Sequence, residues 1–166
     1  MRVYHGSTVI VSEPLAKAGR RNLDFGEGFY VTDLEEQAIS WAQRPSNHGK
    51  PRYLNIYELD LDWIIAAGYR FKRFEAYDEE WLEFVVANRR GLDEWKNYDI
   101  IEGGIANDRV FNTIELYVAG LTPQEEALKR LRYEHPNNQI CILCQEIIDK
   151  FLHFIEAVDI RKEEMT

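Results

Sequence analysis

Two short motifs near the start of the chain combine residue types that bind a planar ring. The first is the run YHGS at residues 4–7, and the second is the run FGEGFYVTD at residues 25–33. Tyr30 and Trp41, eleven residues apart, can form two walls for a ring by offset stacking. A ring nitrogen of His5 can donate a hydrogen bond to a hydroxyl. Together these residue types indicate a site for a flat ring with a hydroxyl-bearing group beside it.

Short strands followed by a helix are expected to position these motifs. Residues 2–8 have the composition of a strand. Gly26 and Gly28 permit a turn that leads into a second strand at residues 29–32. An apolar stripe at helical spacing predicts a helix over residues 34–42, and this helix carries the tryptophan.

The rest of the chain alternates strands and helices without a regular βαβ repeat. Strands are expected over residues 52–62, 98–105, 139–143 and 151–160, and helices over residues 79–90, from about residue 112 and from residue 122. The apolar phase switches between Ile56 and Tyr57, which predicts a β-bulge or a strand buried on both faces. The predicted fold class is α+β, a single domain over residues 1–160 with a tail at 161–166.

Composition and charge narrow the classes of partner. The 166 residues are 45% hydrophobic and 30% charged, as is usual for a globular domain. A net charge of −9 disfavours a partner recognised mainly through phosphates, unless a local basic patch exists. Apolar runs are too short to span a membrane and the N-terminus lacks a signal-peptide core, so we expect no membrane contact and a cytoplasmic location.

Cys141 and Cys144 form a C-x-x-C pair, which is either a redox or metal-binding pair or two buried thiols. A redox pair is best placed at a helix N-terminus, and a zinc site needs two further ligands. The pair instead lies in an apolar run of strand composition, which favours buried thiols. No metal site is predicted.

On these motifs the chain resembles the ADP-ribosyltransferase superfamily, in the branch whose motifs are His, Tyr and Glu on three separated strands. His5 and Tyr30 match the first two positions, and Gln139 stands at the third. Residues 25–33 are similar to the F-G-x-G-x-Y-F-A-D element of poly(ADP-ribose) polymerases, and Trp41 falls where the family has its second aromatic wall. More closely, the chain resembles bacterial domains of unknown function assigned to this superfamily. The resemblance implies a split mixed β-sheet with flanking helices, and NAD as the substrate.

The resemblance also implies roles for individual residues. Catalysis would involve His5, Tyr30 and Gln139, and NAD would be held by Gly6, Ser7, Arg20, Asn22, Phe25, Gly26, Gly28 and Trp41. Without a side chain, Gly6 lets its backbone N–H and C=O pair with the carboxamide of nicotinamide. The guanidinium of Arg20 offers a bidentate fork for the pyrophosphate.

Gln139 departs from the family's pattern, which has a glutamate there. That glutamate holds a ribose hydroxyl and stabilises the positive charge that develops as nicotinamide leaves. The side-chain carbonyl of Gln139 can accept the same hydrogen bond but carries no charge, which predicts slower NAD hydrolysis or transfer of a single ADP-ribose. Glu102 and Glu115 are carboxylates that could substitute.

An NAD-dependent ADP-ribosyltransferase that modifies a protein or nucleic-acid acceptor is therefore the leading hypothesis. By family analogy, a small transferase of this kind is a toxin or effector with an antitoxin or immunity protein as its partner. Two alternatives stay open. One is a catalytically weak module that binds NAD or ADP-ribose, and the other is an interaction domain in which the motifs only pack.

Overall fold

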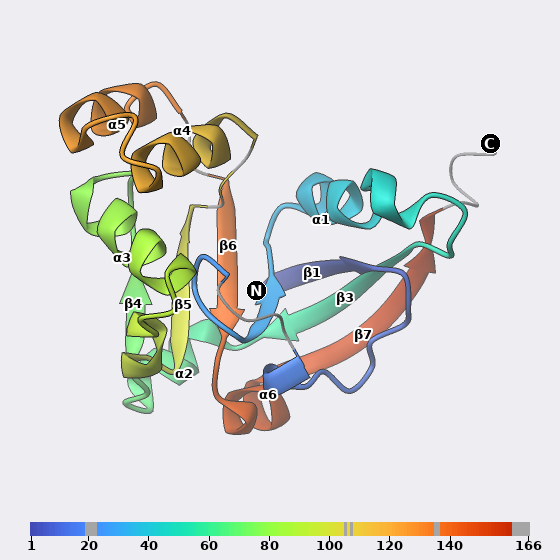
Figure 1. Cartoon of the computed structure of the whole chain (residues 1–166). Coiled ribbons are helices and arrows are strands. Elements are labelled where there is room, and N and C mark those ends of the chain that lie inside the picture. The colour runs from blue at the N-terminus through green and yellow to red at the C-terminus, as the bar shows by residue number, and fades with distance from the viewer. Residues whose placement is uncertain (19–22, 105, 107, 135–136, 161–166) are drawn as a thin grey trace.

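The computed structural model describes residues 1–18, 23–104, 106, 108–134 and 137–160, and they form two small β-sheets with helices around them (Figure 1). The first sheet is antiparallel, in the order β1 (Arg2–Ser7), β3 (Tyr53–Leu59), β7 (Leu152–Asp159). The second has the order β2 (Phe29–Val31), β6 (Asn138–Ile142), β5 (Ile100–Gly104), β4 (Phe71–Arg73), and its β4–β5 pair is parallel. The predicted α+β class is confirmed.

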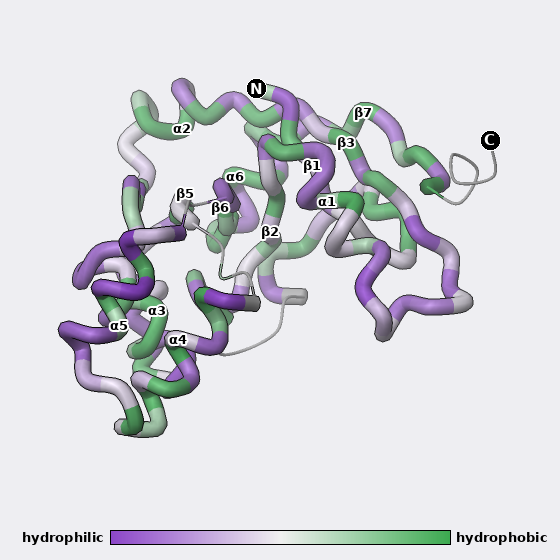
Figure 2. Tube along the Cα trace, turned by 90° about the horizontal axis from the view of Figure 1, so that it is seen from above, coloured by the Kyte–Doolittle hydropathy of each residue, from purple (hydrophilic) through white to green (hydrophobic). Residues whose placement is uncertain are grey.

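The helices cover the outer faces and the ends of the two sheets. They are α1 (Glu35–Ala42), α2 (Leu61–Ala66), α3 (Glu79–Arg89), α4 (Asp108–Val118), α5 (Gln124–Leu131) and α6 (Gln145–Phe151). Helix α1 packs on β1, whereas α3, α4 and α5 gather beyond the second sheet (Figure 1). Figure 2 shows long hydrophilic stretches along the outermost of these, α5. Short 3-10 helices span Ala16–Ala18, Pro45–Asn47 and Glu94–Asn97. Within the described ranges, no helix is long and apolar enough to cross a membrane.

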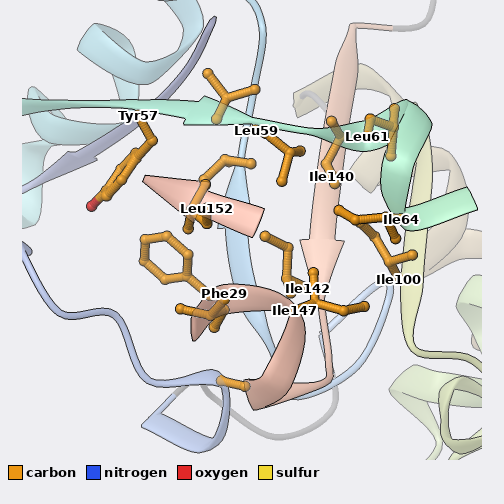
Figure 3. Packing of buried hydrophobic residues seen from close by; sticks show 14 residues of the cluster. Phe29, Tyr57, Leu59, Leu61, Ile64, Ile100, Ile140, Ile142, Ile147 and Leu152 are labelled. Carbon is orange, nitrogen blue, oxygen red and sulfur yellow. The ribbon is translucent and has the colours of Figure 1, made fainter. Parts of the chain in front are cut away.

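Alternate residues of β5 and β6 face two different hydrophobic cores. Ile100 and Ile142 belong to the core between the two sheets, which α2 and α6 close at one end (Figure 3). Ile101 and Cys141 belong to the core beneath α3, α4 and α5. The second sheet is therefore buried on both faces.

The switch of apolar phase in β3 corresponds to a change of packing partner and to a β-bulge. Ile56 packs in a third core beneath α1, whereas Tyr57 packs in the core between the sheets. The pairing of β3 with β7 shifts at this point: Ile56 pairs with Glu156 and Tyr57 with Phe154. Both explanations that the sequence suggested for this strand are confirmed.

Two predicted boundaries are wrong, and one strand was not predicted. The strand expected over residues 52–62 ends at Leu59, and α2 follows, because Leu61 and Ile64 bury a helical stripe one turn apart. The helix expected from about residue 112 begins at Asp108, and the three-residue strand β4 was not expected. The predicted tail at residues 161–166 lies outside the described residues.

Gly6 allows α1 to lie directly on β1. A Cβ atom at this position would stand 1.8 Å from the carbonyl oxygen of Ala38 and 2.9 Å from the amide nitrogen of Ala42. Both of these contacts are backbone atoms of α1, which cannot yield without moving the helix. The packing of α1 is therefore a sufficient reason for glycine at this position, independent of any ligand.

We predict that Gly6→Ala lowers the free energy of unfolding by about 1–3 kcal/mol or more, as overpacking of a close contact does. Ser7→Ala is the control, because it removes a hydroxyl that accepts the exposed Val9 N–H at 3.3 Å and adds no atom. Urea unfolding of both variants measures the difference. Equal stabilities of the two variants would show that α1 is free to move away from β1.

Candidate functional site

The two sheets meet where β1 runs beside β2. Tyr4 and Thr32 exchange two backbone hydrogen bonds, of 2.7 and 3.0 Å. One residue further along β1, Nδ1 of His5 donates to the carbonyl oxygen of Tyr30 at 2.7 Å. These contacts hold together two motifs that lie some twenty-five residues apart in the chain.

A cleft of about 850 Å³ opens along this junction, a volume within the range of small-molecule sites. Its lining includes all three predicted catalytic residues, His5, Tyr30 and Gln139. It also includes four of the predicted NAD-binding residues, Gly6, Ser7, Gly28 and Trp41. Residues from β1, β2, α1 and β6 are thus brought to one cavity, as the sequence analysis expected.

The backbone of Gly6 faces this cleft. Alternate residues of an antiparallel strand direct their N–H and C=O groups to the same edge. Tyr4 directs both groups away from β3, to Thr32, so Gly6 directs its own two groups to that same edge, beside Tyr30. No hydrogen bond from another described residue reaches them. A donor and an acceptor are therefore presented side by side, as an amide ligand requires.

His5 has its tautomer set by Tyr30. A carbonyl oxygen can only accept, so Nδ1 carries the proton and Nε2 is the acceptor of the neutral ring. Burial lowers the pKa of His5 despite this hydrogen bond, and the positive charge of Arg44 lowers it further. We expected a ring nitrogen to donate to a ligand hydroxyl, but that donor is already used. His5 can instead accept a hydrogen bond from the hydroxyl.

The Tyr30 hydroxyl closes the glycine loop. It donates to the carbonyl oxygen of Gly26 at 2.6 Å and accepts from the N–H of Phe25 at 3.2 Å. Phe25 is fully buried, and Gly26 has a φ of 94° with Trp95 packed against it. Neither Phe25 nor Gly26 is among the residues that line the cleft, so this geometry gives no support to the prediction that they contact the ligand. They hold the ring of Tyr30 in place.

Gly28 has a packing role like that of Gly6. A Cβ atom here would stand 2.5 Å from Sγ of Cys141 and 2.8 Å from the carbonyl oxygen of Ile142. Glycine therefore lets the start of β2 approach β6 closely. This approach brings Tyr30, on β2, and Gln139, on β6, to the same cleft.

Gln139 is buried, and its amide is held by the carbonyl oxygen of Gly104. The side-chain Nε2 donates to this oxygen at 3.3 Å, and Nε1 of Trp81 donates to the same oxygen at 3.2 Å. This network assigns the orientation of the amide and leaves Oε1 as the atom that can accept from a ligand. A glutamate carboxylate at this position has no N–H group to donate to the carbonyl oxygen of Gly104. The local hydrogen bonding thus explains why an amide is favoured here.

Neither of the two alternative carboxylates lines the cleft. Glu102 pairs with Arg73 at 3.0 Å and accepts from the side chain of Asn138 at 2.9 Å. Glu115 lies 3.6 Å from Arg89 and is exposed. The prediction that either could replace a glutamate at position 139 is not supported by this geometry.

Charged residues that the sequence analysis did not select also line the cleft. Arg44 follows α1, donates from Nε to the carbonyl oxygen of Trp41 at 2.9 Å, and is exposed. Asp24 and Arg89 form an ion pair on the opposite side of the junction. The spacing of Arg44, three residues after Trp41, was the signal that could have identified it. The predicted pyrophosphate residues Arg20 and Asn22 lie outside the described residues.

Both cysteines are free thiols, and they differ in exposure. Cys141 is fully buried in β6, and burial raises the pKa of its thiol well above the usual range. Cys144 is half-buried and is the N-terminal cap of α6, so the expectation that the pair lies within a strand is wrong for Cys144. In the part of the chain that the structure describes, no group of three His, Cys, Asp or Glu side chains is placed to hold a metal ion. The reading as structural thiols fits the burial of Cys141.

We predict that acid destabilises the protein through His5. The folded state binds the His5 proton at a lower pH than the unfolded state, whose pKa is near 6.5, so the unfolded state binds more protons as the pH falls. Between about pH 7.5 and 5.5, the wild type should lose more unfolding free energy than His5→Asn, which keeps a donor for Tyr30. His48→Gln, at an exposed histidine, is the control and should retain the wild-type slope. Parallel slopes for wild type and His5→Asn would contradict the assignment.

Comparison with known proteins identifies the family of the chain. The model of the family described as "Protein of unknown function (DUF3990)" matches residues 1–154. No curated protein and no solved structure gives a significant match. The match covers the second sheet, β1, β3, the first residues of β7 and every residue of the cleft described above, and the chain belongs to the DUF3990 family.

Proposed function

We propose that the cleft binds NAD and that the protein is an NAD-dependent ADP-ribosyltransferase with the split-sheet fold of that superfamily. One observation carries the proposal. His5, Tyr30 and Gln139 come from three strands that are distant in the sequence, and they line one cleft together with Trp41. These are the positions on which the resemblance to the superfamily rests.

The chemistry of the lining suits each part of NAD. The outward-facing N–H and C=O of Gly6 match the carboxamide of nicotinamide, and Tyr30 and Trp41 offer aromatic surface for its ring. Nε2 of His5 accepts a hydrogen bond from a ribose hydroxyl. The guanidinium of Arg44 offers a fork for the pyrophosphate.

The proposed reaction breaks the bond between C1′ of the ribose and N1 of nicotinamide. The bonding electron pair leaves with N1, so nicotinamide departs neutral and the positive charge moves to the ribose. An oxygen or nitrogen of the acceptor then bonds to C1′ and releases its proton to water. Oε1 of Gln139 can accept a hydrogen bond from a ribose hydroxyl during this step, but it contributes no charge.

The neutrality of Gln139 favours a second candidate function. Because its amide is already fixed by Gly104, the site is well organised to bind NAD or ADP-ribose without rapid turnover. A binding module would take up NAD and release no nicotinamide. A transferase would release nicotinamide and label a macromolecular acceptor, and by family analogy a toxin of this type would have a neutralising protein as its partner.

We predict that Trp41→Ala weakens NAD binding by roughly 1–3 kcal/mol, the usual contribution of a stacked aromatic side chain. Trp41 is half-buried at the cleft, so the variant should remain folded. Trp63→Ala is the matched control, because Trp63 is 70% exposed on α2 and lies outside the cleft. Isothermal titration with NAD measures both variants. If they bind NAD equally well, Trp41 is a packing residue of α1.

We predict that Gln139→Ala slows nicotinamide release and leaves NAD affinity largely intact, because the lost hydrogen bond matters most in the transition state. Gln139→Glu adds a charge beside the ribose and should raise the rate. It also removes the donor to Gly104, at a cost of about 1–3 kcal/mol in stability. Gln124→Ala, on α5, is the control. Identical release rates for all four proteins would place Gln139 outside the chemistry.

A further inference from the structure

Asp24 brings a negative charge to the cleft. Of the described residues that line the cavity, it is the one that carries a carboxylate. Its side chain is 14% exposed and is held by Arg89, with Nε at 2.8 Å and a terminal nitrogen at 2.6 Å. Both contacts fall on Oδ1, and no described residue forms a hydrogen bond or ion pair with Oδ2. One carboxylate oxygen therefore remains for a ligand.

The carboxylate is held rigidly at the end of α3. Asn88 donates from its side chain to the backbone carbonyl of Asp24 at 2.8 Å. Arg89 is itself fixed, because its guanidinium lies 4.7 Å from the ring centre of Phe111 and 3.6 Å from Glu115. A charged group that is oriented before the ligand arrives stabilises charge more effectively than a mobile one.

The electrostatic balance of this group is negative. Asp24 and Glu115 together carry two negative charges against the single positive charge of Arg89. Arg44, the other described arginine of the lining, follows the end of α1, and α1 and α3 lie on opposite sides of the junction (Figure 1). The Asp24 side of the cleft therefore suits a positively charged part of a ligand. Asp24 is also close to the Tyr30 wall: burial is the main cause of the raised pKa of Tyr30, and the charge of Asp24 adds to it.

We propose that Asp24 is a catalytic residue of the NAD reaction, a role that rests on the proposed function. Through Oδ2 it stabilises the positive charge of the nicotinamide ring in bound NAD, and it stabilises more strongly the charge that concentrates on the ribose as the C1′–N1 bond breaks. It forms no covalent bond. Asp24 thus supplies, from the glycine loop, the negative charge that Gln139 lacks.

The test compares the oxidised and reduced cofactors, because their nicotinamide rings differ in charge. For wild type, Asp24→Asn and Glu125→Gln, the dissociation constants for NAD⁺ and NADH are measured by titration, and nicotinamide release from NAD⁺ by chromatography. Asp24→Asn should lower the preference for NAD⁺ over NADH and slow release by roughly 10²-fold. Glu125→Gln, which neutralises an exposed carboxylate in the first turn of α5 outside the cleft, should change neither quantity.

A second variant keeps the proposal testable if Asp24→Asn does not fold. Arg89→Gln removes the compensating positive charge but keeps side-chain N–H groups that can donate to Oδ1 of Asp24, so it should raise the preference for NAD⁺ over NADH. Melting temperatures identify which variants are folded. Asp24→Asn and Arg89→Gln should therefore shift the preference for NAD⁺ over NADH in opposite directions. Only an effect of charge predicts this result, because a merely structural role would weaken the binding of both cofactors alike.

The outcomes separate this role from the proposed function. If the wild type binds NAD⁺ and releases nicotinamide while Asp24→Asn behaves as the wild type, Asp24 has no role and the proposed function stands. Equal loss of NAD⁺ and NADH affinity, or an unchanged preference in Arg89→Gln, also overturns the role. If the wild type neither binds NAD⁺ nor releases nicotinamide, the proposed function fails and the role of Asp24 fails with it.

Discussion

Among the residues that the structure describes, three hydrogen bonds join the two sheets, and the cleft depends on them. Two are the backbone bonds between Tyr4 and Thr32, and the third runs from His5 to the carbonyl oxygen of Tyr30. They align β1 with β2 for a short distance only. Beyond that point β1 stays paired with β3 on its other edge, and the backbone groups of Gly6 form no hydrogen bond to the described residues of β2. The same contact both assembles the domain and presents an unpaired strand edge to a ligand.

Much of the secondary structure could be predicted from local patterns, because strands such as β1, β2 and β3 have strong composition or a clear apolar phase. The bulge in β3 was even visible as a phase switch at Ile56 and Tyr57. The division into two sheets could not be predicted in this way, since strand pairing is set by contacts between distant segments. Short elements such as α2 and β4 were missed or misassigned because six or three residues carry too little periodic signal.

The residues of the candidate site that belong to sequence motifs were predicted. Those that only the tertiary fold brings to the site were missed. His5, Tyr30, Trp41 and Gln139 were selected from sequence, and the structure brings them to one cleft. The direction of hydrogen bonding was not predictable: His5 proved to have its donor engaged by a backbone carbonyl, which no local pattern reveals. The Asp24–Arg89 pair was also not predictable, because its members lie sixty-five residues apart and meet only when α3 packs against the glycine loop.

We propose above all that the cleft at the junction of β1 and β2 holds the nicotinamide end of NAD. A crystal structure of the protein soaked with NAD tests this most directly. Electron density is expected for the carboxamide against the backbone of Gly6, with the ring beside Tyr30 and Trp41 and the ribose within hydrogen-bonding distance of His5 or Gln139. Density for NAD elsewhere on the molecule, or an empty cleft at saturating NAD with the site open to solvent in the crystal, would contradict it.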